Sequence, residues 1–296
     1  MIWPGPYFAF WDAHEGDPLE QQVEAFVRDV VPAHPELYTA DVIGLDPSQP
    51  HEAALRARLT MMLPKIAARI DEVRATHREL RRDLAQYERS FLASFDDFRY
   101  EGRVIVLGAV GGFDGATRTI DGELALLFGV DGMTLYHPEG TNPAPFFHHE
   151  LFHIYHQQRL APAGIDLDAD PTIAMALWIE GLAVYVSREL NEGATPEDML
   201  LNPAMIAETQ ARLPELTAEL RAKARSTDEA AYADFFLGNG SGRVPERCGY
   251  YVGLLVAERL GETRDLETLA GMHGETLVGE IEAALRELGE ASSPSD

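Results

Sequence analysis

The chain carries two histidines four positions apart in the segment His149-Glu150-Leu151-Phe152-His153. In an α-helix, residues at i and i+4 lie on one face, so both imidazoles can point at one metal ion. Glu150 is rotated from His149 by about 100° around the helix axis, so its carboxylate can act on a water beside that metal. The segment therefore predicts a helix in the middle of the chain that carries two zinc ligands and a general base.

The residues around this segment are mostly apolar, as a helix in a protein core requires. Pro143 and Pro145 precede it, and Thr141 and Asn142 are suitable caps, so a helix start is expected there. The alternative is an ordinary amphipathic helix whose histidines are solvated or hydrogen-bonded in the core. The apolar flanks that favour the metal-binding interpretation are Phe146, Phe147, Leu151, Phe152, Ile154 and Tyr155.

The composition narrows the class of protein. Hydrophobic residues make up 46% of the 296 residues, which supports a folded core rather than a disordered chain. Asp and Glu number 49 against 24 Lys and Arg, and the resulting formal charge of -25 disfavours nucleic acid and anionic membrane surfaces as partners. The single cysteine, Cys248, excludes an intramolecular disulfide framework and a cysteine-rich zinc site, so any zinc needs histidine and carboxylate ligands.

The sequence shows no membrane-spanning segment and no export signal. No run of about 18 or more apolar residues is present. The first residues, Met1 to Pro6, lack the basic and apolar regions of a signal peptide. We therefore expect a protein without a membrane span that is cytoplasmic, or else a mature form whose export signal has been removed.

A long helix is expected in the first third of the chain, after a short helical stretch from Leu19 to Val31. Its apolar residues recur alternately every four and three positions after Pro64, which gives one seam along a helix. This helix is expected to be a scaffold packed on its own domain, although the seam also suits a coiled-coil partner. The seam consists of Ile66, Ile70, Val73, His77, Leu80, Leu84, Tyr87 and Phe91, with His77 expected to pack rather than to bind a ligand.

Strands and then helices follow this seam. Apolar runs predict strands at 103–110, 124–130 and 133–136, the last two joined by a turn at Asp131-Gly132, with Gly111, Gly112 and Gly115 in a loop. Helices are expected at 171–190, 195–224, 228–237, 246–260 and 266–288, with Gly261 and Gly289 as C-caps. This order predicts an α+β fold: a small antiparallel or mixed sheet, then the metal-binding helix and a helical C-terminal half.

A catalytic zinc usually has three protein ligands and one open position, so a third ligand is needed. The extended metzincin form of the motif is excluded, because Arg159 stands where that form requires a histidine. His156 shares a face with His149 but lies too far along the helix, and we expect it to pack or to support a ligand. Three further candidates, Asp166, Asp168 and Asp170, form an acidic loop that is more typical of a solvated turn.

Glu180 is the strongest candidate for the third ligand. It lies in an otherwise apolar segment, between Trp178 and Leu182. A buried carboxylate is costly unless it is paired or binds a metal. Gly181 and Ala183 are small, so another helix can approach closely at this point. The alternative is an exposed glutamate at a helix edge, which the apolar flanks disfavour.

Three motifs together resemble a known group of enzymes. The first spans His149 to His153, the second spans Trp178 to Tyr185 (WIEGLAVY), and the third spans Gly249 to Gly253 (GYYVG). They resemble the gluzincin branch of the zincin metallopeptidases, and most closely the bacterial families described only as predicted zinc-dependent proteases. The likeness covers roughly residues 100–260, and its specific part is the first two motifs.

The resemblance implies a domain organisation and a ligand set. A zincin-like metallopeptidase domain would cover residues 99–290, after a helical region at 1–98 packed on it and before a frayed tail at 291–296. His149, His153 and Glu180 would hold Zn2+. Glu150 would take a proton from the attacking water and pass it to the leaving nitrogen.

The resemblance also implies how a peptide or protein substrate is held. The strand at 124–130, with Leu126 and Phe128, would be the sheet edge along which an extended peptide pairs. Tyr250 or Tyr251 is the candidate donor to the developing oxyanion, although both are as well explained by helix packing. Arg247 is a second candidate donor, or a group for a substrate carboxylate.

One position departs from the family pattern. Many gluzincins carry an aspartate four residues after the ligand glutamate, where it orients a zinc histidine, and here that position is Val184. The acceptor that metal-bound histidines need would then come from Asp170 or from a backbone carbonyl.

We therefore expect a zinc-dependent peptidase that hydrolyses peptide bonds through a zinc-activated water. One alternative is a zinc hydrolase acting on a non-peptide amide or ester, which the same ligands would serve. Another is a zinc-binding scaffold or regulatory protein without turnover, for which the long seam and the helical C-terminus would provide partner contacts.

Overall fold

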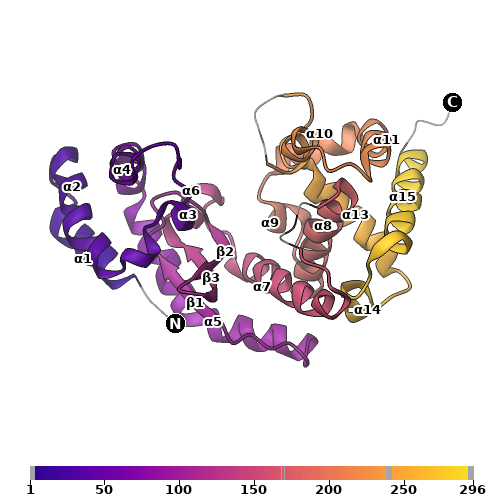
Figure 1. Cartoon of the computed structure of the whole chain (residues 1–296), viewed down its shortest axis with the longest axis horizontal. Helices are drawn as coiled ribbons and strands as arrows, with labels where there is room; N and C mark the ends of the chain where they lie inside the picture. The colour runs from indigo at the N-terminus through magenta and orange to yellow at the C-terminus, as the bar shows by residue number, and fades with distance from the viewer. Residues whose placement is uncertain (1–3, 168, 170, 238–241, 293–296) are drawn as a thin grey trace. The chain divides into compact units, whose positions relative to one another are not determined.

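The computed structural model describes residues 4–167, 169, 171–237 and 242–292. These residues are mostly helical and include one three-stranded mixed sheet (Figure 1), so the predicted α+β class is confirmed. It forms two compact units: unit 1 comprises Met1–Ala85 and Tyr100–Thr141, and unit 2 comprises Gln86–Arg99 and Asn142–Asp296. The strands thus belong with the N-terminal helices, whereas the sequence grouped them with the metal-binding helix beyond a boundary at residue 98.

Aromatic side chains from the first helix of unit 1, and from the helical turn that follows its second helix, pack together in the core of this unit. Tyr7, Phe10, Trp11 and Phe26 are buried and pack with their rings edge to face. The first helix was not predicted from the sequence, because it is apolar on most sides and shows no helical period. The helices are α1 Gly5–His14, α2 Leu19–Ala25, α3 Ala40–Ile43, α4 His51–Ala67 and α5 Ile70–Ser94, with helical turns between Phe26 and Leu37.

The apolar seam follows α5, but it does not begin after Pro64 as expected. Pro64 lies inside α4, where it lacks the N–H that would bond to the carbonyl of Thr60, and α4 ends within a turn of it. Ile66 therefore belongs to α4, and the seam starts at Ile70. His77 packs against the ring of Phe8, as expected for a packed histidine. The buried seam residues of α5 are Ile70, Val73, Leu80, Leu84, Tyr87 and Phe91.

The sheet of unit 1 has the order β1-β3-β2, with β1 Arg103–Leu107, β2 Gly115–Ile120 and β3 Glu123–Gly129. β3 pairs in parallel with β1 and antiparallel with β2. Gly115, the first residue of β2, was predicted to lie in a loop, and no strand was predicted at 116–120, because this segment lacks a run of apolar residues. The hairpin turn lies at Asp121-Gly122, where both residues have positive φ, as a two-residue type I′ turn requires.

The predicted third strand at 133–136 is wrong, because these residues belong to helix α6 Val130–Tyr136. The Asp131-Gly132 pair makes no hairpin. The carboxylate of Asp131 instead accepts hydrogen bonds from the backbone N–H groups of Ala109 (2.7 Å) and Gly111 (2.8 Å). A Cβ at Gly132 would lie 1.8 Å from the carbonyl oxygen of Phe113, so a glycine is needed there for close packing rather than for a turn.

Unit 2 is helical, but several helices are shorter than the sequence predicted. The region 195–224 divides into three helices, and the region 266–288 into two. Gly261 and Gly289 lie inside helices rather than at caps, and Ala291 ends the last helix, while residues 293–296 of the predicted tail lie outside the described residues. The helices are α7 Pro143–Leu160, α8 Ile173–Glu189, α9 Pro196–Leu200, α10 Pro203–Ala211, α11 Leu213–Lys223, α12 Glu229–Tyr232, α13 Cys248–Gly261, α14 Leu266–Ala270 and α15 Gly274–Ala291.

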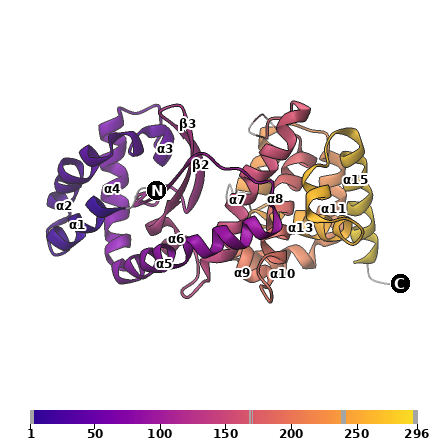
Figure 2. The ribbon, with the colours of Figure 1, turned by 90° about the horizontal axis from the view of Figure 1, so that it is seen from below.

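Helices α8 and α13 lie side by side in unit 2 (Figures 1 and 2) and touch backbone to backbone. A Cβ at Gly181 would lie 2.3 Å from Cα of Gly253, and a Cβ at Gly253 would lie 2.4 Å from the carbonyl oxygen of Leu177. Any larger residue at either position would push the helices apart. The close approach that the sequence predicted at Gly181 is therefore present, and it places Glu180 beside the first turns of α13.

No described helix is both long and apolar enough to cross a membrane.

Candidate metal centre

Helix α7 has the expected local start. The side chain of Asn142 accepts a hydrogen bond from the N–H of Ala144 (3.0 Å), and Pro143 occupies the first helical position, where no donor is needed. One and a half turns further on, His149 and His153 lie on one face of α7. Their Nε2 atoms are 3.0 Å apart.

Glu180 on α8 faces both histidines. Its Oε2 atom lies 3.5 Å from Nε2 of His149 and 3.5 Å from Nε2 of His153. The three side chains are 15%, 23% and 18% exposed for His149, His153 and Glu180, so the cluster is largely shielded but not sealed. The structure thus brings together the three residues that the sequence predicted as ligands.

The geometry and chemistry of this cluster fit a zinc ion. The buried Oε2 of Glu180 has no hydrogen-bond partner among the described residues, a costly state for a carboxylate oxygen. Tetrahedral zinc with bonds of about 2.0–2.1 Å places its ligand atoms about 3.3 Å apart, close to the 3.0 and 3.5 Å separations here. Two imidazoles and one carboxylate also form a known catalytic zinc set that leaves one position open.

The protonation states suit the same role. Burial lowers the pKa of His149, and the neighbouring His153 lowers it further. Burial alone would raise the pKa of Glu180, but the two histidines outweigh it and hold that pKa well below its usual range. Both shifts favour a neutral His149 imidazole and an ionised Glu180, which are the forms that bind a metal.

Glu150 is partly buried on α7, next to His149 in sequence. Its position one residue along the helix turns it by about 100° from His149. Glu150 is not among the residues whose ligand atoms form the cluster, and its role as a base stays a prediction.

The structure distinguishes the two candidate tyrosines on α13. The ring of Tyr250 lies 6.4 Å from that of His149, nearly parallel to it, and burial and the charge of Glu180 raise the pKa of Tyr250. The hydroxyl of Tyr251 instead accepts a hydrogen bond from Gln210 on α10 (2.7 Å). Consecutive helical residues point about 100° apart, so only one of the pair can face the cluster. That residue is Tyr250.

Arg247 immediately precedes α13 and lies on the same side as Tyr250. Its φ of 58° places it in the left-handed region, which costs energy for any residue other than glycine. The carbon of its guanidinium group lies 4.3 Å from the centre of the Tyr250 ring, a cation–π distance. Burial and His153 lower the pKa of His149, and the positive charge of Arg247 lowers it further. The charge of Arg247 therefore lies near the cluster.

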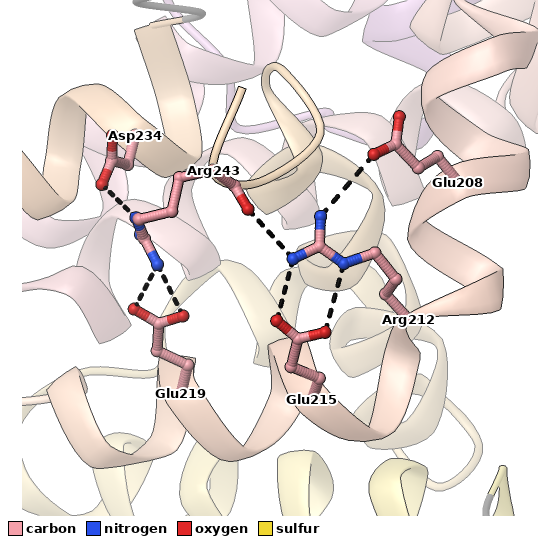
Figure 3. A network of polar contacts seen from close by, with 6 residues as sticks. All are labelled: Glu208, Arg212, Glu215, Glu219, Asp234 and Arg243. Atoms are coloured by element: carbon pink, nitrogen blue, oxygen red, sulfur yellow. Dashed lines mark hydrogen bonds and ion pairs between the residues drawn. The ribbon is translucent and has the colours of Figure 1, made fainter. Parts of the chain in front are cut away.

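A polar network supports the segment that leads to Arg247 (Figure 3). Arg243 donates hydrogen bonds to Glu219 (2.7 and 2.8 Å) and Asp234 (2.7 Å). Arg212 donates to the carbonyl of Arg243 (3.0 Å) and to Glu215 (2.8 Å). Single exposed ion pairs contribute little, but this network ties α11 and the helical turn at 233–237 to the start of α13.

Two aromatic residues near the cluster, Tyr232 and Phe236, were not predicted from the sequence. Burial and the charge of Glu180 raise the pKa of Tyr232, at the end of α12. Phe236 lies between Tyr232 and Tyr250, with ring centroids 5.3 and 6.3 Å away, and a Cβ at Gly249 would lie 2.3 Å from its ring. No local motif marks these residues, because they come near the cluster only when α12 packs on α8 and the turn at 233–237 packs on α13.

Of the other candidates for the third ligand, the described ones, His156 and Asp166, do not join the cluster. His156 is fully buried beside the ring of Phe152, and burial lowers its pKa to about 3, so it is a neutral core histidine. Asp166 is exposed, while Asp168 and Asp170 lie outside the described residues. Val184 is buried on α8, and Asp170, the alternative acceptor for a zinc histidine, lies outside the described residues.

The predicted peptide-binding edge is wrong. Leu126 and Phe128 lie on β3, the central strand, whose two sides are already paired with β1 and β2. Both side chains are fully buried. A sequence pattern identifies a strand but not its position in the sheet, since that position depends on which other segments pair with it.

No protein-family model matches the chain, and no similar protein was found among curated sequences or solved structures. The likeness to gluzincins therefore rests on the three sequence motifs and on the cluster itself.

Proposed function

We propose that this protein is a zinc-dependent peptidase with a zincin-like unit 2, in which His149, His153 and Glu180 hold the metal. The observation that carries the proposal is the buried Oε2 of Glu180, which lacks a hydrogen-bond partner among the described residues and is equidistant from two histidine nitrogens. Burying a carboxylate oxygen that accepts no hydrogen bond is costly, and a cation bound between Glu180 and the two histidines would offset that cost.

The residues around the cluster have separate roles in this proposal. A zinc ion bound there supplies Lewis acidity, which lowers the pKa of a water towards about 7 and polarises a carbonyl. Glu150 accepts the proton of the attacking water and returns it to the leaving nitrogen. The phenol of Tyr250 donates to the developing oxyanion, for which its raised pKa keeps it protonated. Arg247 binds a carboxylate of the substrate.

The proposal is tested with Glu150→Gln, which keeps the shape of the side chain but removes its basicity. We expect peptide hydrolysis to fall by at least about 100-fold, the usual contribution of a general base, while one zinc per chain remains bound. Metal analysis and digestion of a peptide library are the measurements. The matched control is Glu290→Gln, an exposed glutamate on α15, which should leave both unchanged.

The outcomes separate the proposal from its alternatives. Unchanged turnover in Glu150→Gln would overturn the assigned base. A wild-type protein that binds zinc but cuts no peptide would overturn its assignment as a peptidase. A screen of amides and esters would then show whether it is another hydrolase or a protein without turnover.

A further inference from the structure

His148, the residue before the first metal ligand, makes a set of hydrogen bonds that the proposed chemistry does not use. It is 1% exposed. Its Nε2 lies 2.8 Å from the hydroxyl of Ser90 and 3.1 Å from the carbonyl of Tyr87, both on α5 within unit 2. Its Nδ1 lies 2.8 Å from Nδ2 of Asn191. Both ring nitrogens of a buried histidine are thus satisfied.

The partners fix which nitrogen of His148 carries the proton. The amide of Asn191 donates one hydrogen to the carbonyl of Ser187 (2.6 Å), so the nitrogen of that amide also faces His148 and donates to Nδ1. Nδ1 is therefore an acceptor, and Nε2 carries the hydrogen that it donates towards Tyr87 and Ser90. Burial lowers the pKa of His148, which keeps the ring neutral.

This arrangement excludes a second catalytic site. Ser90, His148 and Asn191 have the residue types of a nucleophilic triad, with the histidine between the other two. A base must accept the serine proton at Nε2, but here Nε2 carries a hydrogen and the serine hydroxyl donates to the carbonyl of Tyr87 (2.8 Å). Ser90, His148 and Asn191 therefore have a structural rather than a catalytic role.

The same hydrogen bonds join the two helices that carry the metal ligands. Asn191 lies two residues beyond the end of α8, and it bonds to α7 directly before His149. The hydroxyl of Ser187 donates to the carbonyl of Pro145 (2.6 Å), in the first turn of α7. Ser187 and Glu180 are seven residues apart, about two turns, and so lie on one face of α8. The contact with α7 and the ligand Glu180 therefore share that face.

We propose that Asn191 and Ser187, acting through His148 and Pro145, are positioning residues that hold α7 against α8 so that the three metal-binding atoms are assembled before the metal arrives. The inference rests on the metal site of the proposed function but not on peptidase activity. Without these bonds α7 can rotate or slide on α8, and each ligand must then be brought into place when the metal binds, which weakens binding.

The test measures zinc affinity of the full chain by competition with a chelator, for wild type, Asn191→Ala and the milder Ser187→Ala. We expect the zinc Kd to rise by about 10- to 100-fold in Asn191→Ala, as when a partner that orients a ligand is lost, and by less in Ser187→Ala. The absorption of bound Co2+ should change as well, because it reports the geometry of the ligands.

The matched control is Thr217→Val on α11, which removes another buried hydroxyl bond in unit 2, to the carbonyl of Leu213 (2.8 Å). It should lower the melting temperature without changing the zinc Kd or the Co2+ spectrum. Wild-type affinity in Asn191→Ala, or an equal loss in Thr217→Val, overturns the inference.

A second measurement keeps the inference separate from the proposed function. If wild type binds zinc but cuts no peptide, the proposed function fails and the affinities still decide the inference. If wild type binds no zinc, hydrogen exchange of the metal-free protein decides it. Exchange at residues 149–153 should then be faster in Asn191→Ala than in wild type, with α15 unchanged, and equal exchange overturns the inference.

Discussion

Each unit of this protein buries a carboxylate, and the two carboxylates differ in the groups that lie within bonding distance of their oxygens. In unit 1, Asp131 is fully buried and both its oxygens accept hydrogen bonds from backbone N–H groups, those of Ala109 and Gly111. In unit 2, Glu180 is largely shielded, and its Oε2 has only the two histidine nitrogens at 3.5 Å and no hydrogen bond among the described residues.

The hydrogen-bond partners of a buried carboxylate distinguish a structural group from one that binds a ligand. The chain itself provides the partners of Asp131, so this side chain holds the loop between β1 and β2 in place and needs nothing more. The chain provides Glu180 only with other metal-binding side chains. Burial alone does not distinguish the two residues, whereas their hydrogen-bond partners do.

The largest expected effect comes from removing the ligand carboxylate with Glu180→Ala. Four-ligand zinc sites bind with about 10–16 kcal/mol, or roughly 3–4 kcal/mol for each ligand, so zinc affinity should fall by a few hundred-fold. Competition with a chelator measures it. In the metal-free protein the same substitution removes the favourable pairing of Glu180 with the two histidines together with the cost of burying its charge, so the melting temperature should change little. A large loss of stability in the metal-free protein would make Glu180 structural, like Asp131.

The pH dependence of the stability of unit 1 tests the role of Asp131 as a structural carboxylate. Burial raises the pKa of Asp131 to about 6, opposed in part by its backbone hydrogen bonds, and the facing Tyr7, Tyr38 and Tyr136 stay neutral because their own pKa values are raised. A raised folded pKa means that the contribution to stability is complete below about pH 4 and is lost as pH rises through about 6. The loss is at most about 3 kcal/mol.

Asp131→Asn removes this titration, and hydrogen exchange of the β1 and β3 amides between pH 4 and 7 measures the stability of unit 1. The stability of wild type relative to Asp131→Asn should decline across this range, while other carboxylates cancel in the difference. A constant difference would show that the pKa of Asp131 is not raised.

A third substitution asks whether the open side of the Glu180 cluster is used for catalysis. Tyr250→Phe should lower kcat by about 100-fold, because one donor to a developing oxyanion is lost, with zinc affinity unchanged. Tyr251→Phe is the matched control, since that hydroxyl bonds to Gln210 on α10 and should affect stability alone. Equal kcat values for the two variants would remove Tyr250 from the mechanism.

The smallest expected effect concerns Arg247. Arg247→Gln should raise KM about tenfold for peptides in which a free carboxylate lies near the scissile bond, because a charge-assisted hydrogen bond is lost, while kcat stays close to wild type. Amidated versions of the same peptides are the control and should show no change. An equal rise for both kinds of peptide would assign Arg247 to the packing of Tyr250 instead.

Two Asp-Gly pairs show why the sequence identified some turns and missed others. Asp121-Gly122 and Asp131-Gly132 are identical dipeptides, and the second was predicted to be the hairpin. Only the first has positive φ at both residues. The second lies in helix α6, because Asp131 bonds to Ala109 and Gly111, twenty or more residues earlier in the chain. Local sequence cannot distinguish the two, since the deciding partners are distant.

The residues of the candidate site also fall into those that local sequence could identify and those that it could not. His149, Glu150 and His153 were predictable because helical spacing alone puts them on one element. Glu180 could be ranked from its apolar flanks, which signal burial. Tyr232 and Phe236 could not be found, and Tyr250 could not be chosen over Tyr251, because those assignments depend on how α12, α10 and α13 pack.

The order of residues alone was enough to predict the α+β class, the helix that carries two histidines and a glutamate, and a buried glutamate that needs a partner. These follow from periodicity and from the cost of burying charge, which act over a few residues. Only the tertiary structure decided that β3 is central, that Gly181 and Gly253 let α8 and α13 touch, and that Glu180 faces both histidines. The physical reason is that pairing and close packing join segments far apart in the chain, and only folding brings their atoms within a few ångströms.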